Sequence, residues 1–145
     1  MSQADTVAEL GSRINIIEEA YEFMLAYASQ GLASDLENDT GRQAREYLKK
    51  CDAALTNLGE FLNGFTDRTG VDPVAPYRAF IAVIDRDARD AQAAIQLVLA
   101  QSAISSQLVD NLNASIHLRA LLTDIFLIDE ILKLRNPAST AVSSE

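Results

Sequence analysis

Few side chains in this chain of 145 residues have the types and spacing needed for catalysis or metal binding. The chain holds one histidine, His117, and one cysteine, Cys51. Zinc and haem sites take ligands of these types, and di-iron bundles need Glu-x-x-His pairs, which the sequence lacks. It also lacks a glycine-rich phosphate-binding loop. We therefore expect no metal, no cofactor and no enzymatic activity.

The acidic stretch at residues 35–39 has part of the spacing of a calcium-binding loop. Acids alternate there, and Glu46 follows at the position of the last ligand in an EF-hand loop. The position that requires glycine for the turn holds Thr40, however, and Gly41 comes one place late. We expect a capped acidic loop followed by a helix rather than a calcium site.

His117 is the residue that could take part in phosphotransfer. Histidine phosphotransfer domains are four-helix bundles with one exposed histidine, and their pattern places a leucine and a basic residue shortly after it, followed by glycine. Here Leu118 and Arg119 follow His117 one place early, and the glycine is missing. This partial resemblance implies a phosphotransfer-like domain as a third interpretation of function. A structural or surface histidine explains the same residue more simply.

Tyr21, Met24 and Tyr77 could line a ligand pocket. Tyr21 and Met24 lie on the apolar side of the first predicted helix, and Tyr77 lies near the start of the third. A buried tyrosine hydroxyl needs a hydrogen-bond partner, and ligands often bind between the helices of a bundle. Ordinary core packing is the more common explanation of such aromatic and methionine residues. Cys51 lies on an apolar stripe that runs through residues 44–65, which predicts a buried and unreactive thiol.

The elements that must position these residues are helices. The sequence has only six glycines and three prolines, and its apolar residues recur at spacings of three and four. We predict four helices, which cover about residues 5–30, 40–64, 73–101 and 106–134. The third helix breaks between residues 101 and 106, and the fourth has a stutter or kink at 108–114. Short connections predict an antiparallel up-down-up-down four-helix bundle. Residues 1–136 form one domain, and 137–145 a flexible C-terminal tail.

The last predicted helix carries two apolar stripes. The first includes Leu121, Ile125 and Ile128 and suits the core of the bundle. A surface helix of a small monomer needs only one stripe, so we expect the second to contact another subunit or a partner; a central helix in an uneven bundle is the alternative. Asp124 lies between the stripes, where a carboxylate is costly to bury unless it is paired. The predicted interface consists of Ile116, Ala120, Asp124, Leu127, Ile131 and Leu134.

Charge and composition narrow the partners and the compartment. The formal net charge of −9 argues against nucleic acid as a direct partner. No apolar run reaches the roughly 20 residues that cross a membrane, and the N-terminal residues do not have the pattern of a signal peptide. A single cysteine fits a reducing compartment, so we expect a cytoplasmic protein.

These observations favour a non-enzymatic function. We expect a helical bundle that acts through protein–protein interaction and self-associates through its last helix, as a homodimer or another homo-oligomer. A small-ligand-binding or sensory bundle, with a pocket at Tyr21, Met24 and Tyr77, is the alternative.

Overall fold

The computed structural model describes residues 3–135 and is all-helical, as the sequence predicted. The tail predicted at 137–145 lies outside these described residues. The prediction of four helices is not confirmed in this detail, because the second and the fourth predicted helices are each divided in two; the sequence had predicted a stutter or kink in the fourth. The described residues form six α-helices and one 3-10 helix: α1 Gln3–Ala28, η1 Asp35–Glu37, α2 Asp39–Leu55, α3 Leu58–Thr69, α4 Val74–Leu99, α5 Ser106–Ala114 and α6 His117–Arg135.

The second predicted helix breaks at Asn57, between α2 and α3. Asn57 has a φ of 56°, in the left-handed region that asparagine tolerates better than most residues. The last carbonyls of α2 lose their helical donors here. The Arg13 guanidinium of α1 donates instead to the carbonyl oxygens of Ala54, at 3.2 Å, and Thr56, at 2.9 Å. The break is therefore stabilised by a residue that is distant in the sequence.

The fourth predicted helix breaks at Ile116, between α5 and α6. Ile116 has a φ of 61°, which crowds the Cβ atom and is rare for a β-branched residue. Ser115 ends α5, and its hydroxyl donates to the carbonyl oxygen of Leu112 at 2.5 Å. The break comes directly after residues 108–114, where the sequence predicted a stutter or kink.

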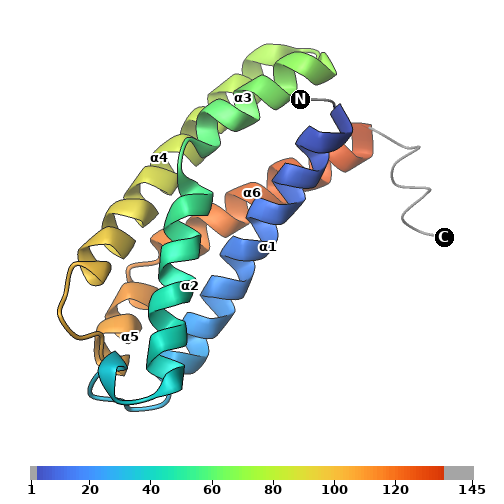
Figure 1. Cartoon of the computed structure of the whole chain (residues 1–145). Helices are drawn as coiled ribbons and strands as arrows, with labels where there is room; N and C mark the ends of the chain where they lie inside the picture. Colours follow the sequence, from blue (N-terminus) through green and yellow to red (C-terminus); the bar gives the residue numbers. More distant parts are fainter. Residues whose placement is uncertain (1–2, 136–145) are drawn as a thin grey trace.

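The two long helices, α1 and α4, each cross the length of the molecule in one piece (Figure 1). α6 packs against both of them and ends where α1 begins (Figure 1). α6 therefore has one flank toward α4, another toward α1, and a side that faces outward. Within residues 3–135, no helix combines the length and the apolar character that crossing a membrane requires.

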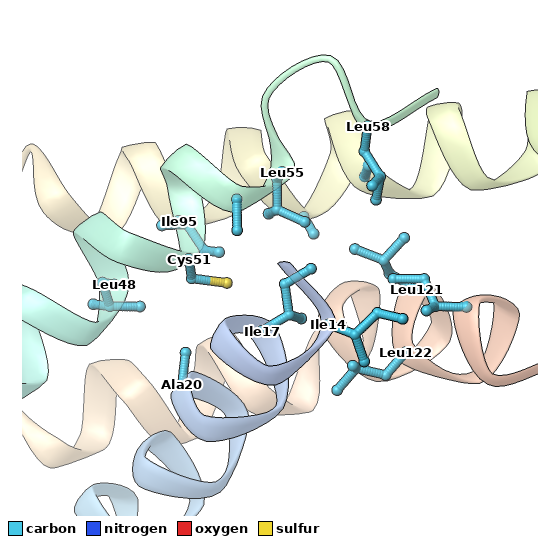
Figure 2. Packing of buried hydrophobic residues seen from close by; sticks show 14 of the residues in the cluster. Ile14, Ile17, Ala20, Leu48, Cys51, Leu55, Leu58, Ile95, Leu121 and Leu122 are labelled. Carbon is cyan, nitrogen blue, oxygen red and sulfur yellow. The ribbon is translucent and has the colours of Figure 1, made fainter. Parts of the chain in front are cut away.

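The core is built largely from the apolar stripes that the sequence spacing predicted. The stripe through residues 44–65 is buried on both sides of the break at Asn57: Ala44, Leu48, Cys51, Leu55, Leu58, Leu62 and Phe65. Figure 2 shows side chains of this stripe meeting those of α1, α4 and α6 in one cluster. In α1 the buried tyrosine is Tyr27, while Tyr21 is half-buried.

The acidic loop after α1 is held by a buried ion pair. Asp35 is 2% exposed, and its carboxylate accepts hydrogen bonds from Arg45 Nε at 2.8 Å and from the backbone N–H of Ile104 at 2.6 Å. Burial alone raises the pKa of Asp35, but these hydrogen bonds outweigh burial and hold the pKa below its usual value. The Tyr27 hydroxyl donates to the carbonyl oxygen of Ile104 at 2.7 Å. These contacts connect α1, α2 and the segment before α5.

Candidate functional site

The six residues predicted as an interface lie along one side of α6 and at the connection before it. We call them the α6 outer face: Ile116, Ala120, Asp124, Leu127, Ile131 and Leu134. Leu134 is 70% exposed, Ile116 58%, Leu127 52% and Ile131 36%. From Ala120 to Leu134 the face extends about 21 Å at 1.5 Å per residue. The other stripe of this helix is in the core, with Leu121, Leu122, Ile125 and Ile128 buried.

Asp124, the polar residue of the α6 outer face, lies against a second carboxyl. Asp87 of α4 faces it across the contact between the two helices. Burial, followed by the hydrogen bond and the negative charge of Asp87, raises the pKa of Asp124 to about 7. The Oδ2 atom of Asp124 is shielded from solvent and has no hydrogen-bond partner among the described residues. When Asp124 is protonated, its carboxyl can donate a hydrogen bond to Asp87.

A shallow groove of about 270 Å³ lies on the opposite flank of α6, against α1. Tyr21 and Leu25 of α1 and Leu122 and Phe126 of α6 contribute apolar side chains to it. Leu25 and Phe126 are each 47% exposed. This groove is a second apolar surface, separate from the α6 outer face.

Tyr21, Met24 and Tyr77 are not all brought together. Tyr21 lines the groove between α1 and α6, whereas Met24 is fully buried in the core. Tyr77 is half-buried in the first turn of α4, which Figure 1 places at the opposite end of the molecule from the later turns of α1. The tyrosine with a buried and satisfied hydroxyl is Tyr27.

A polar groove of about 470 Å³ runs between α3 and α4. Two arginines line it, and each is paired with an acid: Arg78 with Asp67 at 3.1 Å and Arg89 with Asp85 at 3.0 Å. Because the charges are neutralised within the groove, it offers no unpaired arginine to an anionic ligand. Exposed pairs of this kind are typical of a solvated face.

The remaining candidates for chemistry are isolated from one another. His117 is exposed at the first residue of α6. Cys51 is fully buried, and this burial, with a smaller effect from Asp52, raises the pKa of its thiol to about 12. Throughout residues 3–135, no three His, Cys, Asp or Glu side chains gather as a metal site would require.

The sequence interpretation missed Asp87 and Phe126. Asp87 lies in the charged run at residues 85–90, which suggests a solvated face. Asp87 directly precedes the buried Ala88, so it lies at the edge of the buried stripe of α4, and this position could have indicated that Asp87 is partly buried. Phe126 lies outside both apolar stripes of α6, and the groove that it lines depends on Leu25, which is distant in the sequence.

Comparison of the chain with protein-family models, with curated proteins and with solved structures found no match. The residues of α6 and its neighbours are therefore the basis for the function proposed next.

Proposed function

We propose that this protein is a non-enzymatic, cytoplasmic interaction module that self-associates through the α6 outer face. We further propose that the fold is an up-down-up-down four-helix bundle in which α2–α3 and α5–α6 are each one broken member. The observation that carries the proposal is the row of exposed apolar side chains at Leu127, Ile131 and Leu134, on a helix whose other stripe already fills the core. Large contiguous apolar patches on a protein surface often mark interaction sites.

A second copy of the chain is the occupant that we propose. A straight apolar row on one helix is complementary to the same row on an antiparallel copy, so a two-fold axis across α6 pairs the face with itself. Leu127 and Ile131 lie inside the row, and Leu134 lies at its end. The same residues thus form both sides of one closed interface.

The exposed apolar surface is sufficient for a weak dimer. The exposed portions of Ile116, Leu127, Ile131 and Leu134 amount to about two whole side chains, which are worth roughly 3–6 kcal/mol when buried and twice that for two subunits. Association costs about 4–15 kcal/mol in lost translational and rotational freedom. When the association cost is at its lower limit, the burial term exceeds it by about 2–8 kcal/mol, so we expect a dissociation constant no lower than about 1 μM and extending above about 1 mM.

Sedimentation equilibrium over about 10 μM to about 1 mM protein, a range set by the expected affinity, tests the proposal. We expect wild-type protein to dimerise, and Leu127→Lys and Ile131→Asp to be monomeric with unchanged helical content by circular dichroism. Leu97→Lys is the matched control, because Leu97 is a 67% exposed leucine on α4 outside the α6 outer face. If Leu127→Lys and Ile131→Asp dimerise as well as the wild type, this surface is not the interface.

Of the three residues predicted to line a ligand pocket, the alternative function, only Tyr21 lines a groove with apolar neighbours, together with Leu25 and Phe126. Small-molecule sites usually enclose most of their ligand. The residues that would have completed the predicted pocket lie in the core or at the other end of the molecule. Self-association is therefore the function that the geometry favours.

A further inference from the structure

The α6 outer face contains an acid pair at its edge toward α4. Asp124 comes from α6 and Asp87 from α4, so the pair forms only where these two helices pack. Both side chains are half-buried, and Oδ2 of Asp124 lies out of solvent without a hydrogen-bond donor among the described residues. Folding has thus left one carboxylate oxygen unsatisfied on the same face as the exposed leucines.

The other charged groups around Asp124 belong to α6 itself and to the helices that pack near it. On α6 itself, Arg119 lines the same shallow surface groove as Asp124. α1 packs on the opposite flank of α6, where Glu18 and Glu22 line the groove that also contains Arg119. α5 carries Asp110, which is exposed. The charged residues that α1 and α5 contribute here are therefore acidic, whereas α4 carries the basic residue Arg86 next to Asp87 in the sequence.

We propose that self-association through the α6 outer face is coupled to proton uptake by the Asp87–Asp124 pair, so that the dimer tightens as the pH falls. This inference rests on the proposed function, since it concerns how the same surface is regulated. Covering the face with a second copy removes the remaining water from Asp124. It also brings a second, identical acid pair to the interface of a chain with a net charge of −9.

Protonation relieves both effects. A protonated Asp124 carboxyl can donate a hydrogen bond to the Asp87 carboxylate, and the proton removes one negative charge from each pair. The pKa of Asp124, already raised to about 7, places this event near neutral pH. If each subunit takes up one proton on association, the dissociation constant falls by up to about 100-fold for each unit decrease in pH.

Sedimentation equilibrium of the full chain between about pH 8 and pH 6, on either side of the Asp124 titration, tests the coupling. We expect the wild-type dissociation constant to fall by at least about 10-fold over this range. Asp124→Asn should dimerise at pH 8 as tightly as the wild type does at pH 6. Its dissociation constant should change little between pH 8 and pH 6. Asp90→Asn, which removes an exposed acid of α4, should keep the wild-type pH dependence and so controls for net charge.

The outcomes separate this inference from the proposed function. A wild-type dimer whose affinity does not change with pH, or whose pH dependence persists in Asp124→Asn, overturns the coupling and leaves self-association intact. A dimer that tightens as the pH rises also overturns it, since the acids would then be paired with a cation of the second copy. A wild type that is monomeric at every pH overturns both. Circular dichroism at pH 8 checks that Asp124→Asn is folded, as expected for a nearly isosteric change that removes a poorly solvated charge.

Discussion

Replacing Ile116 by glycine and by alanine tests the break between α5 and α6. Ile116 has a φ of 61°, where a Cβ atom is crowded by the backbone at a cost of about 1–2 kcal/mol. Alanine keeps this Cβ and glycine does not. Against this, the greater freedom of glycine in the unfolded chain lowers the free energy of unfolding by about 0.5–1 kcal/mol relative to alanine. Both variants lose the same buried part of the isoleucine side chain, so we expect Ile116→Gly to be more stable than Ile116→Ala by about 0.5–1 kcal/mol.

Thr123 provides the matched control within α6. It is exposed, lies in the helix interior, and its hydroxyl donates to the Arg119 carbonyl oxygen, a contact that alanine and glycine both remove. At such a position alanine is favoured over glycine by about 1 kcal/mol. The stability order of the glycine and alanine variants should therefore reverse between residues 116 and 123.

Urea denaturation followed by circular dichroism measures both differences, provided that the slopes of the four variants agree. If Ile116→Ala is more stable than Ile116→Gly, residue 116 is helical and α5 and α6 form one continuous helix. That outcome would restore the long helix that the sequence predicted and would refute the reasoning from the left-handed conformation.

The other predictions concern the packing of Asp35. A Cβ atom at Gly41 would overlap the backbone of Asp35, so Gly41→Ala should lower the free energy of unfolding by about 1–3 kcal/mol. Gly11 in α1 has open space around it, so Gly11→Ala should raise the free energy of unfolding by about 0.4–1 kcal/mol. If the two variants change the melting temperature equally, the close contact at Gly41 is contradicted. The lowered pKa of Asp35 stabilises the fold above its unfolded pKa of about 3.9, and this contribution disappears as the pH falls through the folded pKa. Asp35→Asn should therefore be less stable than the wild type at pH 7, with the difference shrinking below about pH 4; a constant difference down to pH 2 would argue against the ion pair with Arg45.

Apolar spacing predicted the buried residues better than it predicted the helices. The stripe through residues 44–65 is buried throughout, although the backbone leaves the helix at Asn57. Burial depends on the side-chain pattern, which continues on both sides of the break. The break itself depends on Arg13, whose guanidinium supplies hydrogen bonds to the end of α2 from another helix. A contact between residues so distant in the sequence has no local signal.

The candidate site was predictable to a similar extent. The two stripes of the last helix correctly separated buried Leu121 and Ile125 from exposed Leu127 and Leu134, since helical geometry fixes which residues share a side. The partner of Asp124 was not predictable, because it depends on how α4 is rotated against α6. A single-sequence pattern gives the direction of each side chain around its own axis but not the register between helices.

The requirements of the fold do not explain the α6 outer face. An exposed leucine contributes little to the stability of a monomer, and polar residues would serve equally well at 52% or 70% exposure. A half-buried carboxyl with an unsatisfied oxygen destabilises the monomer when it is ionised. Both features occur on the same face, where each is neutral or unfavourable for an isolated bundle. The proposed association would bury the leucines, and the proposed protonation would satisfy the carboxyl, so the two proposals together account for both features.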